Sequence, residues 1–215
     1  MSHAAITHLF SSVCPWLALV LFIQWLAGGY GLNTRGWGRL SLLGLTAISL
    51  QGLIALGVLA VPVQGIAIAR WVAGVNANFS IPFTGLLAAA VWERAFSRKL
   101  FSARDWSAGW AFGAIAGLML YPLALGWGKF DPYGWGWYFS PLFLAGATLT
   151  GLLVWRNNRF GLLLLLSILA FHLRLLESTN YWDYLLDPVY CLVSVFALGR
   201  RLIARFRRPK PQPEA

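Results

Sequence analysis

Two polar stretches of the chain carry the residue types that could do chemistry, and each follows a long apolar run. The first stretch holds Lys129, Asp131, Tyr133, Trp135 and Trp137. The second holds His172, Arg174, Glu177, Asn180, Trp182 and Asp183. Basic and acidic groups that face one another across an aromatic-lined pocket can bind a charged headgroup, because guanidinium groups hold phosphates and carboxylates with charge-assisted hydrogen bonds. We therefore expect the two stretches to form one site.

The residue types also suggest a division of roles within that site. A carboxylate beside a bound headgroup can serve as general acid or base, which fits Glu177 or Asp183, while Arg174 would hold a phosphate or carboxylate. With His172 as a proton carrier or metal ligand, the catalytic candidates are Glu177, Asp183, Arg174 and His172. The candidates for substrate binding are Lys129, Asp131, Tyr133, Trp135, Trp137, Asn180 and Trp182.

Several charged residues have a structural interpretation as well. Asp187 directly precedes a proline, as a helix N-cap does, and we favour that role over catalysis. Asp131 precedes a proline in the manner of a turn, which we also favour. Arg174 and Glu177 are three residues apart and would pair on one face of a helix, so structural pairing and a functional site stay equally open. A lone histidine such as His172 is more often a hydrogen-bonded anchor.

We expect no metal site and no cofactor. The three histidines have no metal-ligand spacing, and Cys14 and Cys191 sit singly in apolar segments. No Asp, Glu or Lys lies near the centre of a long apolar run, which weighs against an ion-driven carrier. The sequence leaves open whether the chain is an enzyme.

The composition indicates what kind of elements must position the site. Of the 215 residues, 59% are hydrophobic and 11% are charged, whereas soluble domains average about 25% charged residues. Because so little polar surface cannot cover a globule in water, the chain must meet lipid. At about 20 apolar residues for each crossing, the length divides into roughly seven helical spans.

We therefore predict an all-α, polytopic transmembrane bundle of one domain, residues 1–208, followed by a disordered Pro-rich cytoplasmic tail at 209–215. Six spans are expected at residues 13–30, 40–61, 106–125, 139–155, 160–176 and 188–198. Another, the third in order, begins between residues 71 and 79 and ends near residue 93. Pro62 should end or kink the second span, and a capping box at Ser102 and Asp105 should open the fourth. Residues 63–75 form either an extension of the second span or an interfacial segment.

The net charge of +10 is mainly an orientation signal in this interpretation. All of the 17 Lys and Arg residues except Arg70, Lys129 and Arg174 fall on one side of the predicted spans. The positive-inside rule makes that side cytoplasmic, with the N-terminus outside, and we expect the bacterial inner membrane. The expected partners are membrane lipids rather than nucleic acid, with anionic lipid near the basic segment 200–210.

A stripe of small residues offers a surface for another helix. Gly109, Gly113 and Gly117 follow one another at a spacing of four, which lets a second helix approach closely. We favour packing within the chain, and the alternative is contact with a membrane-protein partner.

Three polar residues precede the third predicted span. Asn76, Asn78 and Ser80 would cap the helix that begins near Ser80, which we favour. The alternative is a polar patch beside the loop that holds Glu177.

These observations favour a multi-pass membrane protein that binds, transports or modifies a lipid or lipid-linked substrate at its outer face. The alternative is a non-catalytic accessory or assembly subunit of a membrane complex, which the glycine stripe and the lack of a catalytic motif would suit.

Overall fold

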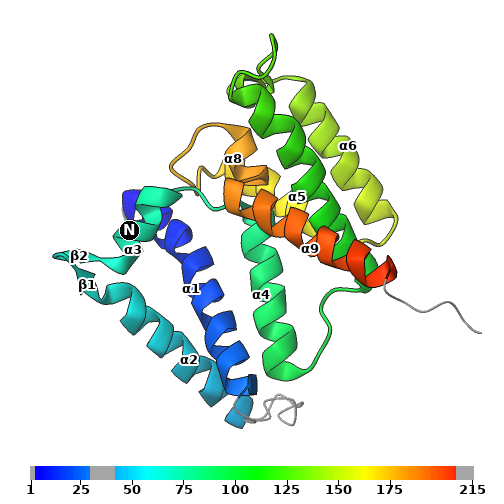
Figure 1. Cartoon of the computed structure of the whole chain (residues 1–215). Coiled ribbons are helices and arrows are strands. Elements are labelled where there is room, and N and C mark those ends of the chain that lie inside the picture. Colours follow the sequence, from blue (N-terminus) through cyan, green and yellow to red (C-terminus); the bar gives the residue numbers. More distant parts are fainter. Residues whose placement is uncertain (1–2, 30–41, 207–215) are drawn as a thin grey trace, which may run out of the picture.

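The computed structural model describes residues 3–29 and 42–206, and the expected tail at 209–215 lies outside them. The regular secondary structure of this part of the chain is helical apart from one short β-hairpin (Figure 1). The long helices are α1 (His3–Gly29), α2 (Leu42–Ala60), α4 (Ile81–Phe96), α5 (Ala103–Ala124), α6 (Pro141–Trp155), α7 (Phe160–His172) and α9 (Pro188–Phe206). The shorter elements are β1 (Pro62–Val63), β2 (Ile66–Ala67), α3 (Ile68–Val75), the 3-10 helix η2 (Pro132–Gly136) and α8 (Tyr181–Leu185).

Two of the described helices are long and apolar enough to cross a membrane. They are α5 and, over Phe10–Ala27, α1. Helices α6 and α7 and the segment Leu45–Ala60 of α2 are apolar but shorter. The predicted all-α class is thus confirmed for the described residues, and two helices reach membrane-crossing length. The bundle of seven spans stays a prediction.

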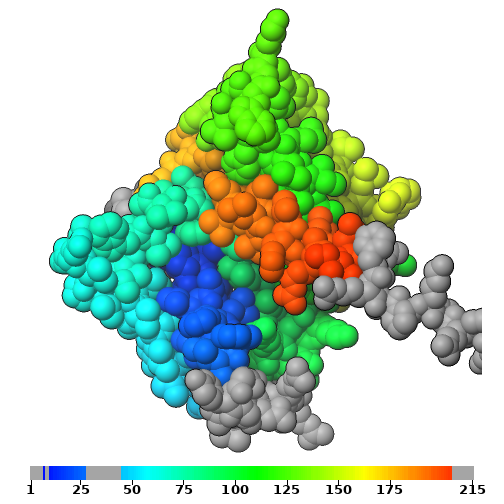
Figure 2. Space-filling view, in the orientation of Figure 1, coloured from blue at the N-terminus to red at the C-terminus, as the bar shows by residue number. Residues whose placement is uncertain are grey.

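The long helices form a bundle with two distinct ends (Figure 1). Successive long helices alternate in direction, so that η2 and α8 gather at one end and the connections 97–102 and 156–159 at the other. Helix α9 packs along α5 on the face that Figure 2 shows. The larger core cluster joins these helices to α4 and α7 through buried aromatic side chains such as Phe83, Phe160 and Tyr190.

At the end of the bundle away from η2, carboxylates accept backbone N–H groups of the two connections. Ser102 Oγ accepts the N–H of Asp105 at 3.3 Å, and the Asp105 carboxylate accepts the N–H of Ser102 at 2.7 Å. The predicted capping box of α5 is therefore confirmed. Asp105 also accepts the N–H of Arg159 at 2.9 Å, while Glu93 accepts the N–H groups of residues 100–101 at 3.0 and 2.9 Å. Both acidic side chains are thus used to hold loops.

Helix α7 ends earlier than predicted. It stops at His172 rather than at residue 176, because Arg174 adopts a left-handed conformation with φ of 51°. The N–H groups of Arg174 and Leu175 then bond to the carbonyls of Phe171 and Ala170 at 3.1 and 3.0 Å. These two hydrogen bonds form a Schellman motif, which satisfies the last carbonyls of the helix.

The glycine stripe of α5 packs within the chain. A Cβ atom on Gly113 would lie 2.3 Å from the Ser194 hydroxyl oxygen, and one on Gly117 would lie 2.2 Å from the Cys191 sulfur. Gly109 is buried as well. Packing within the chain, the favoured interpretation, is therefore confirmed, and the close approach of α9 requires glycine at positions 113 and 117.

Helices α1 and α2 are joined by polar contacts between otherwise apolar surfaces. The Gln24 side-chain amide donates to Gln51 Oε1 at 3.2 Å, and the Trp16 indole N–H donates to the Gly52 carbonyl at 2.9 Å. Their apolar contacts form a second core cluster that reaches α4 through Val91. The pair therefore attaches to the rest of the bundle mainly along α1 and α4.

Residues 62–75 do not extend α2. As predicted, the helix ends just before Pro62, and the chain then forms the β1–β2 hairpin and the separate helix α3. The next helix, α4, begins at Ile81, later than the range expected for the third span.

Candidate functional site

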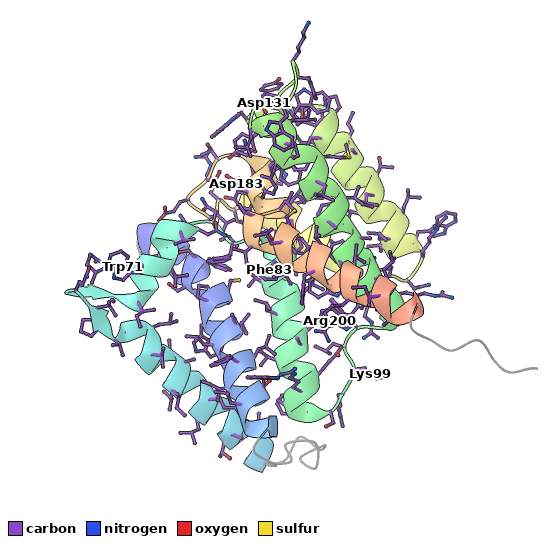
Figure 3. All side chains as sticks on the ribbon, viewed as in Figure 1. Trp71, Phe83, Lys99, Asp131, Asp183 and Arg200 are labelled. Atoms are coloured by element: carbon purple, nitrogen blue, oxygen red, sulfur yellow. The ribbon has the colours of Figure 1, made fainter. Side chains whose placement is uncertain are left out.

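The two polar stretches singled out in the sequence lie against each other at one end of the bundle. The Tyr133 hydroxyl donates to the Asp183 carboxylate, at 3.0 and 3.1 Å from its two oxygens. The Asn180 side-chain amide donates to the Tyr133 carbonyl at 3.0 Å, and the Trp182 indole N–H donates to the Pro132 carbonyl at 2.9 Å. We call the segment 131–137, which contains η2, the segment 173–180 and α8 together the loop cap. Asp131 and Asp183 mark its place in Figure 3.

Each half of the loop cap begins with a side chain that bonds to the backbone two residues later. Asp131 Oδ1 accepts the N–H of Tyr133 at 2.9 Å at the start of η2, so the predicted turn role is confirmed. Asn180 Oδ1 accepts the N–H of Trp182 at 2.9 Å at the start of α8. A Cβ on Gly136 would lie 1.7 Å from Asn180 Oδ1, so a glycine is needed where the halves meet.

A second tyrosine shapes the segment that leads into α8. The Tyr184 hydroxyl lies 3.3 Å from both the N–H and the carbonyl of Leu176 and 3.1 Å from the Ser178 carbonyl. Tyr181 stacks on Phe143 of α6 with ring centroids 4.5 Å apart. The segment is thereby fixed to buried rings. No motif in the sequence pointed to Tyr184.

The loop between α3 and α4 also reaches the loop cap. Asn78 Oδ1 accepts the backbone N–H groups of Glu177 and Ser178 at 3.2 and 3.4 Å. The alternative of a polar patch beside the Glu177 loop therefore describes Asn78 better than a capping role does.

Asp187 forms the most buried polar cluster near the site. Its carboxylate accepts the Ser80 N–H at 2.9 Å, the Ser80 hydroxyl at 2.6 Å and the Tyr190 N–H at 2.9 Å. The Asn76 amide lies 3.4 Å away. The favoured N-cap role of Asp187 is confirmed by the bond to Tyr190. The expected capping by the Ser80 side chain is wrong, because its hydroxyl bonds to Asp187 and makes no bond to the first turn of α4.

In the Tyr133–Asp183 pair, a hydroxyl donates to a half-buried carboxylate, and the pKa of each group is raised. Burial raises the pKa of Asp183, and hydrogen bonds from Ser178 and Tyr133 partly oppose the rise. Burial and the neighbouring Asp183 charge also raise the pKa of Tyr133, so its hydroxyl keeps its proton. Burial likewise raises the pKa of Asp187, against the bonds from Ser80 and Tyr190.

The other predicted catalytic residues lie on the surface of the same region. His172, Arg174 and Glu177 are exposed, and the His172 ring lies 5.9 Å from that of Phe171. Arg174 and Glu177 do not share a helix face as predicted, because α7 ends before both of them. The remaining catalytic candidate, Asp183, contacts the predicted binding residues directly, because it accepts the hydrogen bond of the Tyr133 hydroxyl.

The predicted binding residues differ in burial. Asn180 is fully buried, and Tyr133, Trp135 and Trp182 are half-buried. Lys129, Asp131 and Trp137 are exposed. The Tyr133 and Trp137 rings meet edge to face at 6.1 Å, so the rim of the loop cap is aromatic and carries one lysine.

Among residues 3–29 and 42–206, no group of three or more His, Cys, Asp or Glu side chains is arranged to hold a metal ion. Comparison with protein families, with curated proteins and with solved structures found no match to this chain.

Proposed function

We propose that the chain is a seven-span membrane protein whose loop cap binds the charged headgroup of a lipid or lipid-linked molecule at the outer surface. The spans would be α1, α2, α4, α5, α6, α7 and α9. Support comes from large apolar side chains that are at least half exposed on most of these helices, such as Leu53, Met119, Leu144, Leu169 and Leu192. Monomeric soluble proteins rarely expose so much continuous apolar surface.

The charge distribution supports the orientation that we propose. Lys99 and Arg200 lie at the end of the bundle opposite Asp131 and Asp183 (Figure 3). With the basic end in the cytoplasm, the loop cap faces outward and the C-terminus inward, as the positive-inside rule requires. We propose the bacterial inner membrane as the location.

Cysteine labelling tests the membrane arrangement. In a chain whose buried Cys14 and Cys191 are replaced by alanine, T179C should react with a membrane-impermeant maleimide in intact cells. K99C, at the opposite end, should react only after the cells are permeabilised. Equal labelling of both variants in intact cells would exclude the arrangement.

The left-handed conformation of the exposed Arg174 is the single observation that carries the headgroup proposal. Glycine is the usual residue at a left-handed helix end, and the conformation costs other residues about 1–2 kcal/mol. Arg174 holds this conformation while exposed within the loop cap, and a role in binding would account for an arginine where glycine is usual. In the proposed site Arg174 and Lys129 contact a phosphate, Trp137 covers the glycerol or sugar part, and Asp183 accepts a hydrogen bond from a headgroup hydroxyl.

A binding titration tests the site. Dihexanoyl phosphatidylglycerol, added to the purified protein in detergent, should change the tryptophan fluorescence, since Trp137 and Trp182 belong to the loop cap. R174G should weaken binding by about tenfold, because hydrogen bonds to charged groups are worth about 1.5–3 kcal/mol. It should not lower the unfolding temperature, because glycine accepts the left-handed conformation.

A matched control separates the site from general attraction. R156Q removes an exposed arginine that also follows a helix, at the opposite end of the bundle. It should leave the affinity unchanged. Equal affinities of R174G and the unaltered chain would refute the headgroup site.

A non-catalytic accessory subunit is the second candidate. It is favoured by the internal hydrogen bonding of the loop cap, where Tyr133, Asn180 and Trp182 all bond to groups of the chain itself. A partner would use a surface other than the glycine stripe, which α9 covers. This function predicts that a membrane protein co-purifies in mild detergent and that no phospholipid titration is affected by R174G.

A further inference from the structure

We propose that residues 62–75, which form the β1–β2 hairpin and α3, are an interfacial element that lies on the outer surface of the bilayer. Trp71 and Val75 would enter the boundary of the acyl chains, and Arg70 would lie among the phosphates of outer-leaflet phospholipids. This inference rests on the membrane arrangement proposed above.

The length of α2 brings the chain to that surface. The helix has 19 residues and no charged side chain, and at about 1.5 Å per residue it is about 28 Å long. The hydrocarbon core of a bilayer is about 30 Å thick. With Leu42 near the cytoplasmic boundary, Val61 therefore arrives at the outer one.

The hairpin and α3 form one unit. Gln64 and Gly65 both have positive φ, 52° and 78°, as the tight type I′ turn between two antiparallel strands requires. Val63 pairs with Ile66 across the hairpin. The Trp71 indole N–H donates to the Val63 carbonyl at 3.2 Å, which ties α3 to the first strand.

Helix α3 has one apolar face. On a helical projection, Ile68, Trp71, Val72 and Val75 lie together, and Arg70 lies on the opposite side. Ile68 and Val72 are half-buried toward the bundle, whereas Trp71 and Val75 are 47% and 86% exposed. A short amphipathic helix with tryptophan on its apolar side and arginine on its polar side is typical of membrane interfaces.

The exposed apolar side chains of this unit continue those of α2. Val61, Val63 and Ile66 are each more than 40% exposed and follow directly on the exposed leucines of that helix. Figure 2 shows the unit at the left edge of the molecule, and Figure 3 places Trp71 there, beside the hairpin. The same lipid that surrounds α2 therefore covers this patch, and Arg70 matches the charge of its phosphates.

The element also directly precedes the loop that contacts the loop cap. α3 ends before Asn76, which approaches Asp187, and Asn78 bonds to the backbone of Glu177 and Ser178. Phospholipids bound at α3 would thus lie near the region that we propose binds headgroups.

Spin labels at single cysteines test the inference. The full chain, with Cys14 and Cys191 replaced by alanine, would carry V75C, G74C or L53C in nanodiscs of phosphatidylethanolamine and phosphatidylglycerol. Collisions with oxygen report lipid, and collisions with a nickel chelate report water. We expect V75C to favour oxygen several-fold more than its neighbour G74C, which lies toward the polar face, and L53C on α2 to favour oxygen most.

The control at Leu53 separates two kinds of failure. If L53C meets lipid while V75C and G74C meet the nickel chelate equally, the interfacial element is refuted and the membrane arrangement stands. If L53C meets water, the membrane arrangement itself fails. A V75C label shielded from both reagents would overturn the inference in favour of a protein partner.

Discussion

Asp187 and Asp131 are both followed by proline, yet their surroundings differ. Asp187 is 2% exposed, and its carboxylate holds the loop before α4 against the start of α9 through Ser80 and Tyr190. Asp131 is exposed and bonds to one N–H two residues later. A carboxylate of the same local sequence thus joins distant segments in one place and shapes one turn in the other.

This difference predicts unequal losses of stability. D187A should lower the free energy of unfolding by about 3 kcal/mol or more, because it leaves several buried donors without an acceptor. D131A should cost about 1 kcal/mol or less, as expected for an exposed cap. Thermal unfolding in detergent measures both changes. Similar shifts for the two variants would show that the Asp187 cluster is not important for stability.

Asp183 predicts a dependence of stability on pH. Its pKa in the folded chain is raised by burial, so the folded state binds the proton more tightly than the unfolded state does. Its contribution is therefore most favourable below the unfolded pKa and is lost as the pH rises through the folded pKa. The unfolding temperature should rise when the pH is lowered from about 7 toward about 4, the usual pKa of an aspartate in an unfolded chain.

The variant D183N isolates this contribution. An amide keeps the shape of the protonated carboxyl group, so part of the pH dependence should disappear. Asp187, whose pKa is also raised by burial, should account for a remaining part in the same direction. An unchanged pH profile in D183N would contradict the assignment.

At the scale of elements, the packing of α5 on α9 depends on the absence of side chains at two glycines. G113L would drive a leucine into the Ser194 hydroxyl and the Tyr190 ring, which lie 2.3 and 2.7 Å from the Cβ position. Overpacking of this kind costs about 1–3 kcal/mol. We expect G113L to lower the unfolding temperature of the isolated chain.

A second glycine serves as the control. A Cβ on Gly151 of α6 would meet no atom within 4 Å, so G151L should leave the unfolding temperature nearly unchanged. If G113L left the purified chain as stable as G151L does, the stripe would not be needed for internal packing.

The elements also show what the sequence can and cannot predict. Apolar runs and the residues Pro62, Ser102 and Asp105 were enough to locate most long helices, because these signals act locally. The end of α7 was missed, since the usual glycine is replaced by Arg174. Helix α8 and η2 were missed as well, because each is short and depends on contacts between distant segments.

The candidate site likewise has features that the sequence predicts and contacts that it does not. The sequence indicated which residue types gather in the two polar stretches, yet it gave no means of pairing Tyr133 with Asp183, which are 50 residues apart. The bond from Asn78 to the Glu177 loop is another long-range contact. Such contacts arise from how the helices pack, and no pattern of period or spacing encodes them.

At the scale of the whole molecule, most of the described basic residues lie in the helix ends and connections at the end of the bundle away from the loop cap. Among the described residues this end holds Arg94, Arg98, Lys99, Arg104, Arg156, Arg159, Arg200 and Arg201. Some of these side chains are engaged within the chain, as where Arg201 donates to the Ser107 hydroxyl at 2.7 Å. The exposed remainder would face the cytoplasmic leaflet in the proposed arrangement, where anionic lipid attracts each basic residue by about 1 kcal/mol.

This end predicts a lipid-dependent stability. The unfolding temperature should be higher in nanodiscs that contain phosphatidylglycerol than in nanodiscs of phosphatidylcholine alone, and the difference should shrink at about 1 M salt, where charges are screened beyond about 3 Å. The double variant K99Q and R200Q should lose part of the difference, while K99R and R200K keep it, because they preserve the charge. Equal losses in both double variants would show that shape rather than charge governs the effect, since the attraction between a basic surface and an anionic leaflet depends on charge alone.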